Sequence, residues 1–310
     1  MTETTAEAPG QQAFATLMLI FASVGFGSVA FFARSLAEAG IAPPVIAFFR
    51  FIIPAFAFAP LLVVRGPRAR ATAWGVFAGI VLGVGWIGYV QAISLMPVAT
   101  AGVIYMTYPL FTVLFGWAVF SETPSLRAVT AAGLILAAAT LAAGGAALSG
   151  GLSPVAVLFA SASPAGMGMA IVILTHRLVV LPPLSRMAAT ALGATFGLLP
   201  LILTYPTAQI IPSSGALWML LIGLSLAGAL LPQLLFVVYA PRVGAAAAAS
   251  ASAAELPTMF LIAWMAFGEA LTGPQIAAGA MVLAAILLTQ SRRARNVTTH
   301  IAAENAPDQR

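Results

Sequence analysis

Two charged residues of this sequence lie within long apolar segments, where an isolated charge is costly. Glu255 comes eleven residues after Gly244, the first residue of one such segment, which is about 16 Å along a helix. Arg50 lies about 10 Å into another segment. A charge at the centre of a membrane helix costs about 2.5–3.5 kcal/mol on insertion scales. Both side chains therefore need partners.

The chemistry of these two groups has two interpretations. A carboxyl group at such depth binds a ligand ammonium group or a proton, and a guanidinium group binds a carboxylate. The alternative is an internal tie, from Glu255 to Arg50 or to the backbone, which fixes the helices and binds nothing. The sequence leaves both interpretations open.

Aromatic and polar side chains gather in the same apolar segments. Trp86 and Tyr89 are three residues apart and share one helical face, and Tyr105 and Tyr108 repeat that spacing. Such a set predicts a ligand path lined by rings and a few polar groups. Interfacial aromatic belts and ordinary core filling are the alternative. The expected lining is completed by Gln233, Phe236, Ser28 and Ser163.

Prolines interrupt two apolar segments at corresponding places. Pro109 and Pro257 each free a backbone carbonyl, which the bilayer tolerates only where protein or a water-filled cavity faces the break. A pair of interrupted segments in two halves of a chain indicates a central binding site. We expect both prolines to act as helix-break hinges, although membrane helices in general are rich in proline.

Several kinds of chemistry are disfavoured. The chain has no cysteine, which excludes disulfides, thiolate metal sites and cysteine nucleophiles. It offers one deep acid, and its two histidines, His176 and His300, lie at a segment edge and in the tail. We therefore expect no catalytic residues, no metal and no cofactor, and an intramembrane enzyme is a remote alternative. The arginines are spread over loops rather than gathered on one face, so no nucleic-acid partner is expected.

The elements that position these residues are membrane helices. Hydrophobic residues make up 61% of the chain and charged residues 7%, which is typical of an integral membrane protein in contact with the lipid bilayer. The sequence predicts an all-α fold of ten spans, because a span needs about 20 apolar residues. The ten spans are 14–33, 42–64, 72–94, 98–120, 128–147, 152–174, 187–205, 214–239, 244–267 and 274–290.

The chain is also duplicated. Phe21, Pro43 and Trp74 recur as Phe159, Pro182 and Trp218, and the match closes with Trp117 and Glu122 against Trp264 and Glu269. Each copy has five spans, so the second must enter the membrane from the opposite side, which makes an inverted repeat. The expected divisions are a tail at 1–12, repeats at 13–147 and 152–290, and a second tail at 291–310. A chain that supplies both halves is expected to work as a monomer.

Arginine positions predict the orientation. Short cytoplasmic loops collect basic residues. If the N-terminus is cytoplasmic, eleven of the thirteen arginines lie on the cytoplasmic side, and Arg34 alone flanks the other face. Both termini are therefore placed in the cytoplasm. Glu122 and Glu269, equivalent in the repeat, are expected on opposite sides. The cytoplasmic set is Arg65, Arg68, Arg70, Arg127, Arg177, Arg186, Arg242, Arg292, Arg293, Arg295 and Arg310.

Over nearly all of residues 13–290 the sequence resembles the EamA family of the drug/metabolite transporter superfamily. The patterns that carry the resemblance are Gly25, Gly27 and Ser28; Pro44 with Arg50 and Phe51; Tyr108 with Pro109; Glu255 with Pro257; and the stretches 116–122 and 264–269. The second repeat departs from the family pattern at Pro164 and between Pro183 and Arg186.

The resemblance implies a function. Members of the family are ten-helix bacterial carriers, and within the family this chain is most similar to an exporter of aromatic amino acids. The expected function is export of aromatic and other apolar amino acids and related metabolites across the bacterial inner membrane by alternating access. The alternative within transport is a proton-coupled multidrug exporter with Glu255 as the proton site.

Overall fold

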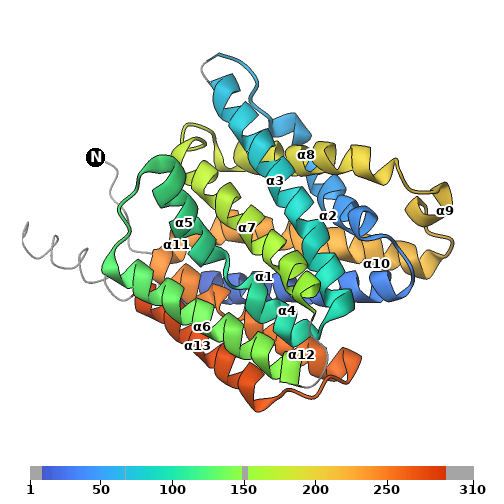
Figure 1. Cartoon of the computed structure of the whole chain (residues 1–310). Coiled ribbons are helices and arrows are strands. Elements are labelled where there is room, and N and C mark those ends of the chain that lie inside the picture. Colours follow the sequence, from blue (N-terminus) through green and yellow to red (C-terminus); the bar gives the residue numbers. More distant parts are fainter. Residues whose placement is uncertain (1–8, 67, 149–152, 291–310) are drawn as a thin grey trace, which may run out of the picture.

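The computed structural model describes residues 9–66, 68–148 and 153–290, and every regular element in these ranges is helical (Figure 1). Nine of the helices described are long and apolar enough to cross a membrane, and Gly273–Ile286 is a shorter apolar one. This confirms the all-helical membrane fold expected from the sequence. The helices are α1 (Pro9–Glu38), α2 (Pro43–Phe58), α3 (Arg68–Leu95), α4 (Val98–Tyr105), α5 (Tyr108–Phe120), α6 (Leu126–Leu148), α7 (Pro154–His176), α8 (Pro183–Ile202), α9 (Thr207–Ile210), α10 (Gly215–Ser225), α11 (Leu231–Ser252), α12 (Glu255–Phe267) and α13 (Gly273–Gln290).

Several helices differ in extent from the spans that the sequence predicts. Helix α1 begins at Pro9, within the predicted tail. Helix α10, a π-helical turn at Leu226–Leu230 and α11 follow one another without a loop, although a link was expected at 240–243. The alanine-rich stretch after Pro241 has high helix propensity, which favours continuation of the helix. The predicted tail at 291–310, with His300 and four arginines, lies outside the described residues, as do residues 1–8.

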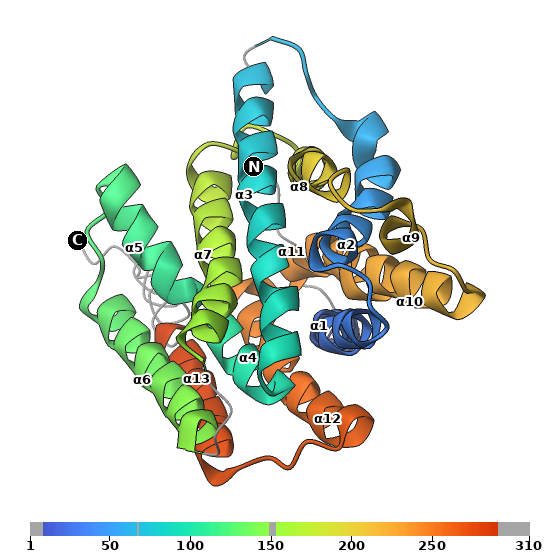
Figure 2. The ribbon, with the colours of Figure 1, turned by 45° about the vertical axis from the view of Figure 1, so that its right-hand side comes forward.

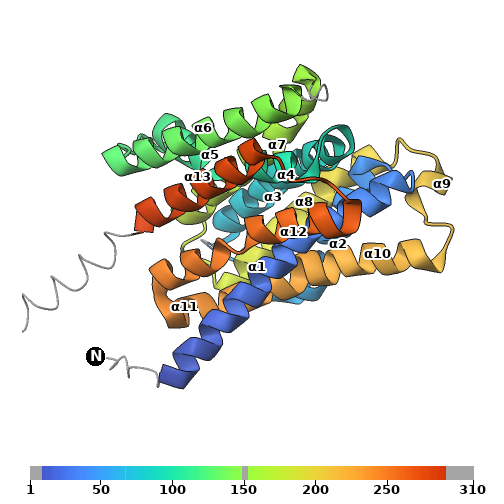
Figure 3. The same ribbon diagram turned by 90° about the horizontal axis from the view of Figure 1, so that it is seen from below.

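Helices from the first half of the chain pack against helices from the second half. Helix α3 packs on α7 and α8, and α1 packs on α11 and α12. Helix α2 lies against α8, and α6 lies beside α13 along one side of the bundle (Figure 2). Seen from below, the start of α1 and the end of α13 lie at the same end of the bundle (Figure 3).

Glycines bring α3 and α8 into backbone contact. A Cβ atom added at Gly79 would lie 2.0 Å from the Thr190 carbonyl oxygen, and one added at Gly193 would lie 2.0 Å from the Val76 carbonyl oxygen. Gly83 faces Ala194 in the same way. The four-residue spacing of the α3 glycines therefore marks a helix-packing face, as small residues do between membrane helices.

The C-terminal ends of α5 and α12 have the same geometry. Ser121 (φ 55°) and Gly268 (φ 64°) have left-handed backbone conformations, and each is followed by a glutamate. The Glu122 N–H donates to the Gly116 carbonyl at 3.1 Å, and the Glu269 N–H donates to the Ala263 carbonyl at 2.9 Å. The Ser121 and Gly268 N–H groups also donate four residues back, to the Trp117 and Trp264 carbonyls at 3.1 Å each, which is the αL type of helix C-cap. The two ends are equivalent in the predicted repeat, so the sequence match extends to local backbone structure.

The glycine contact gives a matched pair of variants. We expect Gly79→Ala to lower the free energy of unfolding by about 1–3 kcal/mol, the usual cost of overpacking a filled contact. Gly133→Ala is the control, because nothing lies within 4 Å of a Cβ at Gly133 and alanine is the better helix former. Thermal unfolding in detergent measures both variants. Equal melting temperatures would contradict backbone contact between α3 and α8.

Candidate functional site

Two helix interruptions border the candidate site. Helix α4 ends at Tyr105 and α5 begins at Tyr108, and α11 ends at Ser252 before α12 begins at Glu255. Pro109 and Pro257 follow these breaks as the second and third residues of α5 and α12. Neither proline has an N–H to donate to the preceding turn, which releases local carbonyl groups. At the first break, the Thr107 hydroxyl donates to the Ile104 carbonyl at 2.7 Å.

Four aromatic rings from α3, α4 and α5 form one cluster. The Trp86 ring centroid lies 4.9 Å from that of Tyr89 and 5.6 Å from that of Tyr105. Tyr89 and Tyr105 are 5.6 Å apart, and Tyr108 follows 5.9 Å from Tyr105. Trp86, Tyr89 and Tyr105 are buried, whereas Tyr108 is half-buried. We call these four residues the aromatic cluster. The rings form a continuous series of contacts from the half-buried Tyr108 to the buried Trp86.

Arg50 of α2 meets this cluster at its buried end. Its guanidinium carbon lies 3.8 Å from the Trp86 ring centroid, a cation–π contact, and the residue is 7% exposed. Pro54 cannot donate to the Arg50 carbonyl four residues earlier, and the buried Ser225 hydroxyl donates to that carbonyl at 3.3 Å instead. The Arg50 backbone is therefore satisfied from α10. The Arg50 Nε and Nη1 atoms are buried without a hydrogen-bond partner.

Glu255 is the first residue of α12 and is half-buried. Arg50, Tyr89, Tyr105 and Tyr108 all lie within electrostatic range of its carboxyl group. Within the part of the chain that the structure describes, this carboxyl group makes neither a hydrogen bond nor an ion pair. The internal tie between Glu255 and Arg50 is not formed. The site thus holds two opposite charges, Arg50 and Glu255, that lie within electrostatic range of each other but form no ion pair.

The other predicted site residues lie elsewhere or in less defined contacts. Ser28 borders an apolar groove between α1 and α11, where its hydroxyl donates to the Gly25 carbonyl at 2.6 Å. Phe236 packs on Phe26 of α1 at 5.8 Å. Ser163 of α7 is buried beside Gly85, and its hydroxyl has no hydrogen-bond partner. Gln233 is half-buried on α11.

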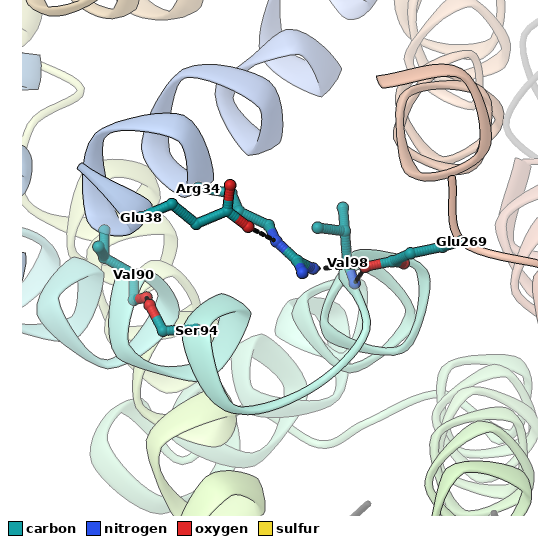
Figure 4. Close-up of polar contacts among 6 residues, drawn as sticks. All are labelled: Arg34, Glu38, Val90, Ser94, Val98 and Glu269. Atoms are coloured by element: carbon teal, nitrogen blue, oxygen red, sulfur yellow. Dashed lines mark hydrogen bonds and ion pairs between the residues drawn. The ribbon is translucent and has the colours of Figure 1, made fainter. Parts of the chain in front are cut away.

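A partly buried polar network joins α1, α4 and the link between α12 and α13 (Figure 4). Arg34 pairs with Glu38 at 2.8 Å and also with Glu269. The same Glu269 oxygen accepts the Val98 N–H at 3.0 Å. Val98 is the first residue of α4, so a carboxylate here also interacts favourably with the helix dipole. We call Arg34, Glu269 and the Val98 amide the Arg34 network.

The equivalent acid of the first half has a different partner at the opposite helix end. Glu122 follows α5 and pairs with His176, the last residue of α7, at 3.0 Å. The His176 ring stacks on Phe120, with centroids 4.2 Å apart. The Glu122 side chain is 56% exposed, whereas that of Glu269 is 15% exposed. The two acids, which correspond in the predicted repeat, therefore form ion pairs at the two ends of the bundle, and Glu269 is the more buried of them.

Comparisons with known proteins show a family similarity. Residues 13–144 match the model of the EamA-like transporter family. This part of the chain, less than half of it, is similar to membrane transporters, in agreement with helices that are long and apolar enough to cross a membrane. No match was found among curated proteins.

A likeness in fold extends beyond residues 13–144. A solved structure, titled only as the crystal structure of a protein, is 21% identical to this chain, with a TM-score of 0.61. The alignment covers 91% of this chain and 98% of the solved one. At this identity the likeness concerns the fold alone. The second half of the chain thus also shares an overall fold with a known structure.

The structure adds candidate residues to those that the sequence suggested. Ser225 and the Arg34 network were not among the expected site residues. Arg34 and Glu38 have the spacing of a helical ion pair, and the repeat singled out Glu269. Nothing in the sequence links Arg34 to an acid 235 residues away. A metal site of three or more His, Asp or Glu side chains does not occur among the described residues.

The Arg34 network gives a stability test. We expect Glu269→Gln to lower the free energy of unfolding by about 1.5–3 kcal/mol, because a partly buried guanidinium loses its charged acceptor. Glu38→Gln is the control, since the Glu38 side chain is 57% exposed and surface ion pairs contribute about 1 kcal/mol or less. Thermal unfolding of the purified variants measures the difference. Equal effects of the two substitutions would show that the network contributes nothing beyond a surface pair.

Proposed function

We propose that this EamA-like transporter exports amino acids with aromatic and other apolar side chains, and related metabolites, by alternating access. The observation that carries the proposal is the aromatic cluster at the α4–α5 break. The Arg50 guanidinium stacks on its Trp86 ring, and the Glu255 carboxyl group lies within electrostatic range of its tyrosines. Rings accept an apolar side chain, and the two charges suit the carboxylate and ammonium groups of an amino acid. Family membership alone does not specify a substrate.

Orientation in the membrane is part of the proposal. The arginine distribution supports a bacterial inner-membrane protein with both termini in the cytoplasm, because short cytoplasmic loops carry the basic residues. The Arg34 network then closes the periplasmic end, and the pair of Glu122 with His176 lies at the cytoplasmic end. A monomer suffices, because one chain contains both halves of the bundle.

Alternating access requires the two ends to open in turn. The matching αL ends of α5 and α12, each followed by a paired glutamate, support an inverted repeat whose ends exchange roles. The breaks before Pro109 and Pro257 supply points where helix halves can move against each other. Opening the periplasmic end requires the Arg34 network to separate.

Transport into proteoliposomes tests the substrate class. A panel of labelled amino acids should show preference for aromatic and large apolar side chains. Trp86→Ala should lower transport of phenylalanine about tenfold or more, because the variant removes both a ring and the surface on which Arg50 stacks. Trp117→Ala is the matched control, since that ring is 59% exposed on the outside of the bundle. Equal transport by the two variants would contradict the proposed role of the cluster.

A proton-coupled multidrug exporter is the second candidate. The observation that favours it is the half-buried Glu255 carboxyl group, which makes no hydrogen bond or ion pair in the described ranges. A carboxyl group away from water is more stable neutral than charged, so a group at this position can bind and release a proton.

Glu255→Gln separates the two candidates. If Glu255 carries the coupling proton, the variant should lose accumulation driven by a pH gradient and keep exchange at equal solute concentrations, because exchange moves no net proton. If Glu255 only supports the helices, thermal stability and both transport activities should fall together. Normal gradient-driven accumulation by the variant would exclude Glu255 as the proton site.

A further inference from the structure

We infer that the Arg50 guanidinium, together with the Tyr89 hydroxyl, is the subsite that binds a carboxylate group of the transported solute. This inference deepens the proposed function and rests on it for the identity of the solute. The subsite lies at the buried end of the aromatic cluster, between α2 and α3. Glu255 of α12 is the opposite charge of the same region.

The first argument is the lack of a counter-ion. Arg50 is 7% exposed, and in the described part of the chain its guanidinium group makes neither a hydrogen bond nor an ion pair. A buried charge without a partner is destabilising, so such a group is expected to have a functional partner. Glu255, the nearby acid, does not contact it. An anion from outside the chain satisfies this requirement.

The second argument is the way Arg50 is held. The guanidinium lies 3.8 Å from the Trp86 ring centroid, and the hydroxyl of Ser225 holds the Arg50 carbonyl. Stacking uses the face of the guanidinium plane and leaves the N–H groups at its edge free. A planar carboxylate in that plane can accept two parallel hydrogen bonds. The group is therefore fixed in position before a ligand arrives.

The third argument is a second unpartnered donor. The Tyr89 hydroxyl is buried without a hydrogen-bond partner, and its residue is 1% exposed. Its ring lies 4.9 Å from the Trp86 ring on which Arg50 stacks, and the hydroxyl lies within electrostatic range of Arg50. Buried hydroxyl groups are nearly always hydrogen-bonded. One anionic ligand would satisfy both side chains.

The charges select a carboxylate rather than a phosphate. The region holds one cation, Arg50, and one acid, Glu255, within electrostatic range of each other. A singly charged carboxylate is balanced by the one cation, and an ammonium group on the same ligand can face Glu255. A phosphate brings nearly two negative charges and would be repelled by that acid.

The test compares three probes that differ by one group. L-phenylalanine has both charges, L-phenylalaninamide lacks the carboxylate, and 3-phenylpropanoate lacks the ammonium group. Binding to the purified transporter in detergent is measured calorimetrically. Wild type should bind the two carboxylates. Arg50→Gln should weaken binding of both about 10- to 100-fold, the scale of a hydrogen bond to a charged group, and leave the amide unchanged.

A second variant keeps the test valid if Arg50→Gln fails to fold. Tyr89→Phe removes one hydroxyl group and keeps the ring, so it should weaken binding of the carboxylates several-fold and leave the amide unchanged. Tyr239→Phe is the matched control, because Tyr239 packs on Phe14 of α1 outside the aromatic cluster. Thermal unfolding establishes that each variant is folded.

The outcomes separate this inference from the proposed function. Undiminished binding of 3-phenylpropanoate by folded Arg50→Gln or Tyr89→Phe would overturn the subsite, as would failure of wild type to bind either carboxylate. Binding of 3-phenylpropanoate that depends on Arg50, without binding or transport of any amino acid, would support the subsite and overturn the amino-acid substrate. Amino-acid transport that is unchanged in Arg50→Gln would support the amino-acid substrate and overturn the subsite.

Discussion

The hydrocarbon of a membrane offers no hydrogen-bond partners, so polar groups buried among membrane helices must find partners within the protein or in a ligand. Most polar groups buried in the bundle are satisfied from within the chain. Pro54 frees the Arg50 carbonyl, and Ser225 supplies its donor. Gln275 bonds to Thr272 at the start of α13 and donates to Thr100 of α4 at 3.0 Å. Against this background, the unpartnered atoms of Arg50 and Tyr89 mark a place that the chain itself leaves incomplete.

Backbone contact between helices sets the position of that place. Gly79 and Gly193 let α3 and α8 approach until only hydrogen atoms fit between them. Helix α3 carries Trp86 and Tyr89, and α2, which also packs on α8, carries Arg50. The glycine contact therefore fixes both parts of the site through a common neighbour. Close-packed membrane helices tolerate little change in volume at such contacts.

The two halves of the chain share local geometry and differ in chemistry. Their matching αL helix ends place a glutamate at each end of the bundle, one bonded to Arg34 and one to His176. Arginine keeps its charge at any physiological pH, whereas histidine does not have to be charged. Two helix ends with the same backbone geometry can therefore carry ion pairs of different chemistry.

The sequence by itself determined the membrane class, the helical fold and the family resemblance, because hydropathy, segment length and short motifs are local properties. It also placed Trp86, Tyr89, Tyr105 and Tyr108 together, since residues three apart share a helical face and the paired prolines marked the break. Tertiary structure alone decided that Arg50 stacks on Trp86 instead of pairing with Glu255, and that Arg34 reaches Glu269. It also placed Phe236 and Ser28 in the contact between α1 and α11. Long-range pairing depends on how helices rotate and cross as they pack, and no periodicity within one helix specifies that rotation.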